Sequence, residues 1–151
     1  MKLFGLALAV AALLVPTQAS AMLEVDIGFE PDEVCPGDEV RFFFALENVG
    51  EQEEMVELCM TLSWEGNEFG PICAEFPLAA GEGFMEEFEM MVPPPVPPGT
   101  LTVLVTATDS DGTVEDTAEL TILECRGAAM AMSAKPLIQK FKNELRQHGF
   151  E

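Results

Sequence analysis

The segment Asp109-Ser110-Asp111-Gly112, followed by Asp116, carries the residues best suited to binding chemistry. Carboxylate oxygens are ligands that Ca²⁺ prefers, and calcium-binding loops often begin with an Asp-x-Asp pattern. The complete loop of an EF-hand is absent, because no acidic residue stands at its closing position. The sequence leaves two interpretations, a calcium site that uses Asp109, Asp111 and Asp116 and a plain hairpin turn, and it favours the turn.

The rest of the sequence offers no arrangement suited to catalysis. The adjacent pairs Glu53-Glu54 and Glu86-Glu87 have the residue types of acid–base catalysts, but neighbouring residues on a strand point to opposite faces. The single histidine, His148, lies in the C-terminal tail, so no serine, threonine or cysteine of the main domain has a histidine base. We therefore expect a protein that is not an enzyme and has no cofactor, with calcium the one candidate.

Two alternating runs flank the Asp109 turn and predict a β-hairpin over residues 101–125. Asp109 can cap the turn through backbone amides, and Gly112 can adopt the positive φ that such a turn needs. A two-stranded ribbon is marginally stable alone, so other strands must cover its apolar face. That face carries Leu101, Val103, Val105 and Ala107 on the first arm and Ala118, Leu120 and Ile122 on the second.

Short alternating runs upstream of the hairpin supply the remaining strands. They are separated by turn sequences and cover residues 23–29, 40–47, 56–64, 72–78 and 84–92. The segment PPPVPPG at 93–99 cannot donate ladder hydrogen bonds and should lie outside the sheets. About seven strands with no helical periodicity among them predict an all-β, antiparallel two-sheet sandwich over residues 22–125.

Residues 1–21 have the pattern of a secretory signal peptide. Lys2 precedes an apolar core from Leu3 to Val15, and the small-residue site Ala19-Ser20-Ala21 follows. The apolar core is too short to span a bilayer, and no later segment is apolar enough to do so. We expect an exported protein, periplasmic, cell-surface or extracellular, without a transmembrane span in the mature chain.

Charge is distributed unevenly along the 151 residues, whose formal net charge is -20. Residues 22–125 hold 25 acidic side chains and one basic side chain, Arg41, whereas residues 126–151 hold five basic and two acidic ones. A main domain with so many acidic side chains repels nucleic acid and anionic lipid, which argues against both as partners of that domain. The acidity fits a solvated surface, binding of cations or binding of a basic partner.

Four cysteines lie in the part expected to be exported, where disulfides persist, and they permit three pairings. If the strands at 56–64 and 72–78 pair about Gly66, Cys59 faces Cys73 on the outer surface while the apolar residues on either side also match. No two cysteines have the spacing of a zinc site. Register therefore predicts a disulfide between Cys59 and Cys73.

Three stretches carry a family likeness. PDEVCPGDEVRFFFALENVG, residues 31–50, resembles the opening of bacterial immunoglobulin-like modules, and residues 76–99 resemble the later half of the cell-adhesion-related domain found in bacteria. VTATDSDGTVEDTAELTI, residues 105–122, is similar to the last hairpin of polycystic-kidney-disease-type repeats. The resemblance covers residues 23–125 and implies an immunoglobulin-like sandwich, without the tyrosine corner and central disulfide of antibody domains.

The resemblance also implies a second disulfide and a function. In an immunoglobulin-like sandwich, the short edge strand before the second strand runs parallel to the last strand, which brings Cys35 and Cys125 to the same end to pair. Such modules bind, space or display, and they rarely catalyse. We expect an adhesion-type binding or assembly module at or beyond the cell envelope, with a protein or envelope partner.

The tail changes character after Cys125. Residues 126–132 are expected to form a linker and residues 133–149 a basic amphipathic helix, with Ser133 as its cap and Pro136 in its first turn. The helix could dock on the sandwich at Phe43, Leu104 and Leu123, bind a partner or a membrane surface, or fray. Its partner-binding candidates are the apolar Leu137, Ile138, Phe141 and Leu145 and the basic Lys140, Lys142 and Arg146.

Overall fold

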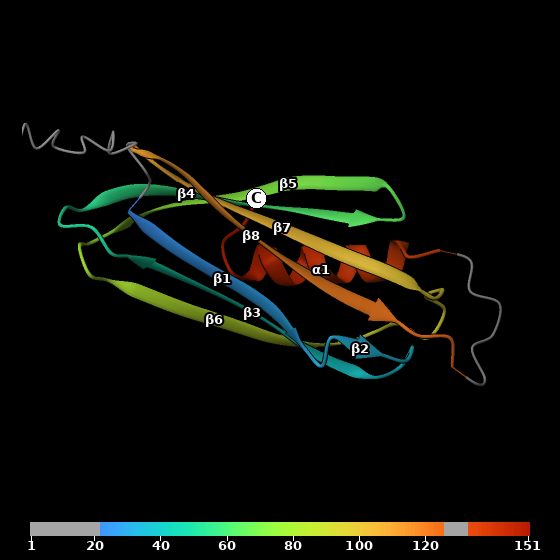
Figure 1. The fold of residues 1–151 in the computed structure, drawn as a ribbon. Coiled ribbons are helices and arrows are strands. Elements are labelled where there is room, and N and C mark those ends of the chain that lie inside the picture. The colour runs from blue at the N-terminus through green and yellow to red at the C-terminus, as the bar shows by residue number, and fades with distance from the viewer. Residues whose placement is uncertain (1–21, 126–132) are drawn as a thin grey trace, which may run out of the picture.

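The computed structural model describes residues 22–125 and 133–151 (Figure 1). The expected signal peptide and linker, residues 1–21 and 126–132, lie outside the described residues. The described chain forms, in order, β1 (Leu23–Glu30), β2 (Glu33–Val34), β3 (Glu39–Asn48), β4 (Glu54–Trp64), β5 (Asn67–Leu78), β6 (Gly83–Met91), β7 (Gly99–Asp109), β8 (Gly112–Ile122) and α1 (Lys135–Gln147).

Two sheets pack face to face, as the sequence predicts. One has the strand order β1-β3-β6 and the other β2-β8-β7-β4-β5 (Figure 1). All pairs are antiparallel except β2 with β8, where Glu33 and Val34 align with Thr121 and Ile122 in parallel. The two-residue β2 is the short edge strand that the immunoglobulin-like resemblance implies.

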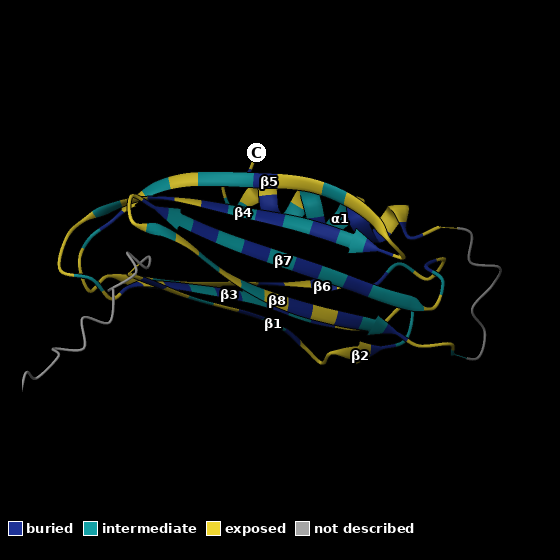
Figure 2. Cartoon of the chain, turned by 45° about the horizontal axis from the view of Figure 1, so that its top comes forward, coloured by how far each residue is buried: buried dark blue, intermediate teal, exposed yellow. Residues whose placement is uncertain are grey.

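Alternation along each strand defines the core. Figure 2 shows buried and more exposed residues following one another along the strands. The buried apolar residues of both sheets form one core cluster. Each large apolar side chain that is fully buried contributes about 1.5 to 3 kcal/mol to folding. Many residues that alternation predicts to face inward are fully buried: Phe42, Phe44, Leu58, Met60, Leu62, Leu101, Val103, Val105 and Leu120.

Both disulfides join the expected partners. Cys59 and Cys73 face each other across β4 and β5, with Cα atoms 4.1 Å apart, and Cys35 and Cys125 join the ends of β2 and β8, with Cα atoms 5.7 Å apart. The register of β4 and β5 shifts near Gly70-Pro71, an irregularity that the alternation does not predict. Gly70 has a φ of 113°, and a Cβ on it would lie 3.0 Å from the carbonyl oxygen of Met60. The bend therefore requires glycine.

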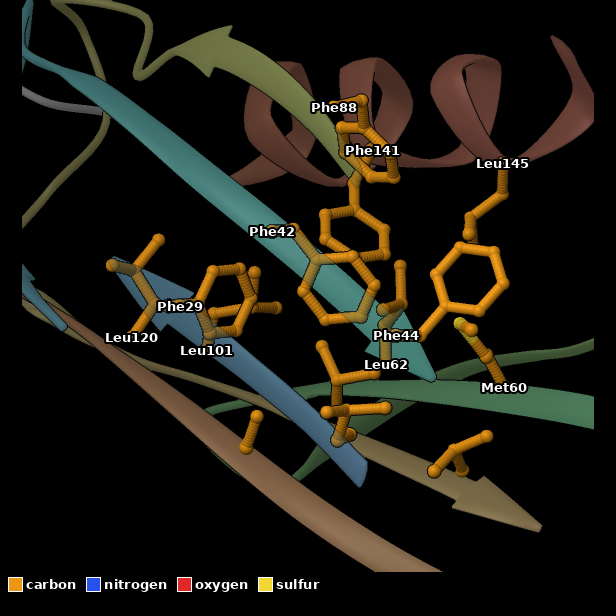
Figure 3. Close-up of a cluster of buried hydrophobic side chains, with 14 of the residues drawn as sticks. Phe29, Phe42, Phe44, Met60, Leu62, Phe88, Leu101, Leu120, Phe141 and Leu145 are labelled. Carbon is orange, nitrogen blue, oxygen red and sulfur yellow. The ribbon is translucent and has the colours of Figure 1, made fainter. Parts of the chain in front are cut away.

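Helix α1 fills the side of the sandwich that the strands leave open. On one side β1 lies against β8, where the Ile27 amide donates to Asp116 Oδ2 at 3.0 Å. On the other side β5 and β6 stand apart, and α1 lies between them (Figures 1 and 2). The ring of Phe141 lies 4.9 Å from that of Phe42 and 5.4 Å from that of Phe88 (Figure 3). The helix is therefore part of the core.

The last residues extend this contact. The Phe150 ring meets the Phe44 ring edge-on, with centroids 5.7 Å apart. The backbone amide and carbonyl of Glu151 exchange hydrogen bonds with those of Cys73, each 2.9 Å long. The C-terminus thus pairs with the free edge of β5.

The expectation that Phe43, Leu104 and Leu123 receive the helix is wrong. Phe43 lies over Gly28 on the outer face of β1 and β3, so close that a Cβ on Gly28 would be 2.5 Å from the ring. Leu123 is 39% exposed. Between β5 and β6 the helix covers the aromatic rings of Phe42 and Phe88. Docking there removes more apolar surface from water than docking on the scattered outer residues would.

Asn48 is fully buried and ties three segments together. Its Nδ2 donates to the carbonyl oxygens of Gln52 and Leu78, at 2.8 and 2.9 Å, and its Oδ1 accepts from the Gly50 amide at 3.0 Å. Because Asn48→Ala removes all three bonds, we expect it to lower the free energy of unfolding by about 2 to 4 kcal/mol in chemical denaturation. The exposed Asn67→Ala is the matched control, and equal losses in the two variants would contradict this role.

Candidate functional site

The Asp109 turn has the capped geometry that the sequence predicts. Asp109 ends β7 and pairs with Gly112, the first residue of β8. Asp109 Oδ1 accepts hydrogen bonds from the amides of Asp111 and Gly112, at 2.8 and 3.0 Å. Gly112 has a positive φ of 154°. The carboxylate thus holds the turn with one oxygen and leaves the other available.

A third carboxylate joins the turn from β4. Glu54 is half buried and its Oε2 accepts a hydrogen bond from Ser110 Oγ at 2.8 Å. One oxygen each of Glu54, Asp109 and Asp111 can be chosen so that all three lie within 4.8 Å of one another. We call these three residues the carboxylate cluster.

Sequence reasoning missed Glu54, although the register of β4 and β7 carries the signal. Glu57 of β4 pairs with Thr108 of β7 in an antiparallel ladder. Continuing that ladder by three residues brings Glu54 level with Asp111. The order of strands in the sheet was needed to see this, because β4 and β7 are far apart in the chain.

Asp116, the third sequence candidate for a calcium ligand, is not part of the carboxylate cluster. Its Oδ2 accepts from the Ile27 amide of β1, and its Oδ1 accepts from the Thr117 amide at 2.9 Å. Both oxygens are therefore engaged, Oδ2 in joining β8 to β1 and Oδ1 in a local bond within β8. The hydrogen bond to Ile27 crosses from one sheet to the other, so Asp116 has a structural role.

A second acidic feature lies near the same end of the sandwich. A pocket of about 740 Å³ is lined by residues of β1, β3, β6 and β8. Its acidic members are Glu24, Asp26, Glu47 and Glu115, all exposed, and we call it the acidic pocket. Glu24 and Glu47 are directly opposite each other on β1 and β3. Like charges at such positions repel, so the pocket is set up to favour a positively charged group.

Apolar side chains accompany these carboxylates. Val25, Ala45 and Met85 also line the acidic pocket, and Met85 is 66% exposed. Ala45 pairs with Asp26 on one side and with Met85 on the other, so the row crosses the sheet. The pocket therefore offers both charge and apolar contact.

Arg41, the one basic residue of the sandwich, sits away from this pocket. It bonds Glu30 on β1 and, at 3.0 Å, Glu87 on β6. The hydrogen bond to Glu30, and then its charge, raise the pKa of Arg41 above its ordinary value, so Arg41 remains charged. Ala45 is four residues further along β3, about 13 Å at the rise of a strand. That exceeds the Debye length of about 10 Å at 0.1 M salt, so Arg41 does little to offset the pocket.

The tail helix presents fewer binding groups than its sequence suggests. Its apolar face is buried in the sandwich and is not a free docking surface, which corrects the interpretation of Leu137, Ile138, Phe141 and Leu145 as partner-binding. The basic residues stay near the surface and make local contacts. Lys140 Nζ donates to the Met91 carbonyl oxygen at 3.1 Å, Lys142 Nζ lies 5.7 Å from the centroid of the Phe69 ring, and Arg146 donates to Asn143 Oδ1 at 3.3 Å.

Solved structures share this fold at low sequence identity. No protein-family model and no curated protein matches the sequence. The chain is similar to part of the alkylpurine DNA glycosylase AlkC of Pseudomonas fluorescens, solved bound to DNA containing an abasic site analogue (TM-score 0.53, 15% identity). That match covers 70% of this chain and 31% of the glycosylase chain, so this chain spans less than one third of it.

Two smaller structures are also similar. One is a CARDB domain from Pyrococcus furiosus, solved in complex with di-metal ions (TM-score 0.44, 13% identity, 68% of this chain and 94% of that one). The other is a FixG-related protein from Vibrio parahaemolyticus (TM-score 0.44, 12% identity, 70% of this chain and 100% of that one). At these identities the likeness concerns the fold alone.

The described part of the chain contains one helix, α1, and it is neither long nor apolar enough to cross a bilayer.

Proposed function

We propose that this chain is an exported, non-catalytic immunoglobulin-like module that binds a basic protein segment through the acidic pocket. The two disulfides support export, because disulfides persist in oxidising compartments. The two-sheet fold supports a binding role of the adhesion or assembly type, since it offers broad sheet faces. The observation that carries the proposal is Glu24 directly opposite Glu47 in a pocket that also exposes Met85.

The partner's chemistry follows from this arrangement. Lysine or arginine side chains would relieve the repulsion between Glu24 and Glu47, and their aliphatic stems could pack on Ala45 and Met85, which lie on the same face of the sheet. Nucleic acid carries the wrong charge for this surface. A Lys- or Arg-bearing protein segment thus fits both the charge and the apolar part of the acidic pocket.

Calorimetric titration with a short lysine-rich peptide tests the proposal. The triple variant Glu24→Gln, Asp26→Asn, Glu47→Gln should weaken binding about 10-fold, because each exposed ion pair contributes roughly 0.2 to 1 kcal/mol. The same substitutions should not impair folding, since they remove like charges from one face. Binding should also weaken as salt is raised.

The matched control removes three charges from the other sheet. Glu57, Glu68 and Glu75 on β4 and β5 are exposed, and their replacement by glutamine changes the net charge by the same amount. The control should bind the peptide within about 3-fold of the unaltered chain, since rim charges far from a contact contribute little. If the two triple variants weaken binding equally, net charge alone attracts the peptide and the acidic pocket is not the site.

A further inference from the structure

Asp109 keeps one carboxylate oxygen buried without a hydrogen-bond partner. The residue is 8% exposed, and Oδ2 accepts no hydrogen bond within the described chain. Buried polar atoms are nearly always paired, and a carboxylate oxygen that is not paired needs a proton, a donor or a cation. The side chain cannot turn away to solvent without giving up the two amide bonds that Oδ1 accepts.

The carboxylates of Glu54 and Asp111 are placed to share a cation with the carboxylate of Asp109. Two oxygens that each lie about 2.4 Å from one Ca²⁺ ion are separated by at most about 4.8 Å. The chosen oxygens of Glu54, Asp109 and Asp111 meet this limit pair by pair. The ion pairs of the described residues are made by Arg41 and His148 with Glu30, Glu86 and Glu87, so none of them neutralises the cluster.

Space for an ion and its water lies beside the cluster. A hollow of about 440 Å³ is lined by Glu54 and Asp111, together with residues of the turn between β3 and β4. Asp111 is exposed and Glu54 half buried, so both side chains can adjust around an ion while Asp109 stays fixed. The hollow is large enough for the waters that complete a coordination shell.

From the unpartnered oxygen, the spacing and the open side together, we infer that Glu54, Asp109 and Asp111 bind one Ca²⁺ ion. Ca²⁺ accepts six to eight oxygens in flexible geometry, whereas Mg²⁺ demands a near-ideal octahedron that two mobile side chains do not enforce. The ion would join the start of β4 to the turn between β7 and β8. This site is separate from the acidic pocket, and neither depends on the other.

Calorimetric titration of the full chain with CaCl₂ measures the binding directly. Three carboxylates plus water predict a dissociation constant of about 10⁻⁴ to 10⁻³ M, the range of extracellular calcium modules. Thermal unfolding should shift upward by roughly 4 to 12 °C in ~10 mM CaCl₂, since a ligand that binds only the folded state stabilises it. MgCl₂, and NaCl at matched ionic strength, should give smaller shifts. Equal shifts in all three salts, or no calcium heat, would overturn the inference.

Two variants locate the ion. Asp109→Asn keeps the oxygen that holds the turn and replaces the unpartnered oxygen with a neutral amide group, which removes the buried charge and its repulsion from Glu54 and Asp111. This variant should therefore melt at a higher temperature than the unaltered chain in EDTA, and should lose the calcium shift. Asp111→Asn should weaken calcium binding at least 10-fold. The exposed Glu119→Gln, on the same hairpin, is the control and should keep the full response. A calcium shift that persists in both cluster variants would place the ion elsewhere and refute the site.

Discussion

Replacing Phe141 with alanine is expected to lower the free energy of unfolding by about 3 to 5 kcal/mol. The ring is fully buried and packs against those of Phe29, Phe42 and Phe88, which belong to three strands of one sheet (Figure 3). The variant leaves a cavity between α1 and the sheet, which closes only if the helix or the strands shift from their packed positions. Chemical denaturation followed by circular dichroism measures the loss, and the melting temperature should fall by roughly 10 to 20 °C.

The control for this prediction lies on the exposed side of the same helix. Gln139 is exposed, and its amide donates to Asn143 Oδ1 on the surface. Gln139→Ala should change stability by no more than about 0.5 kcal/mol, as surface substitutions usually do. A truncation that removes residues 127–151 should lower the melting temperature further than Phe141→Ala. If Phe141→Ala and Gln139→Ala behave alike, the helix is not part of the core.

Removing the disulfide between Cys35 and Cys125 is the second large expected effect. The two residues are 90 positions apart. A bond that closes so long a loop reduces the conformational entropy of the unfolded chain, which stabilises the fold by about 4 to 5 kcal/mol. In the described chain only two residue pairs join β2 to β8, so the disulfide is a main attachment of this short edge strand. The double variant Cys35→Ala, Cys125→Ala should lose most of this free energy in urea unfolding.

The disulfide between Cys59 and Cys73 provides the comparison. Its loop spans 14 positions, which predicts a smaller contribution of about 3 kcal/mol. The strands that carry it are also held by a long ladder between β4 and β5. A greater loss of stability from the Cys59→Ala, Cys73→Ala variant than from the other pair would contradict the loop-length argument.

Strand alternation was enough to predict the layers of the fold and one disulfide. A strand directs every second residue inward, and the match of Cys59 with Cys73 follows from the same parity that buries Leu58 and Met60. Cys35 and Cys125 needed the family likeness, since they pair through a two-residue edge strand. The bend at Gly70 was not predicted, because a bulge depends on the partner strand as well as on local sequence.

The position of the tail helix could not be predicted from its own residues. The apolar face of α1 was evident, but the surface that receives it depends on which side of the sandwich the strands leave open. The order of strands in space decides this, since β5 and β6 end up at the edges of different sheets. Phe43 shows the same limit: its partner Gly28 is found only through the register of β1 with β3.

The candidate site was predicted in part. The Asp109 turn and its capping were expected from the residues, and Asp111 lies beside Asp109 in the carboxylate cluster. Glu54 was not, because its placement depends on the pairing of β4 with β7. Asp116 was grouped with the turn because the two are near in sequence. In the extended strand β8, however, Asp116 lies too far from the turn to reach the carboxylate cluster.

Mapping a lysine-rich peptide onto the protein by amide chemical-shift changes tests the proposed binding function most directly. The largest changes should fall on residues 24–26, 45–47 and 83–85, the parts of β1, β3 and β6 that line the acidic pocket. These changes should disappear in the Glu24→Gln, Asp26→Asn, Glu47→Gln variant. Changes centred on β4 and β5, or spread evenly over every acidic strand, would contradict binding at the acidic pocket.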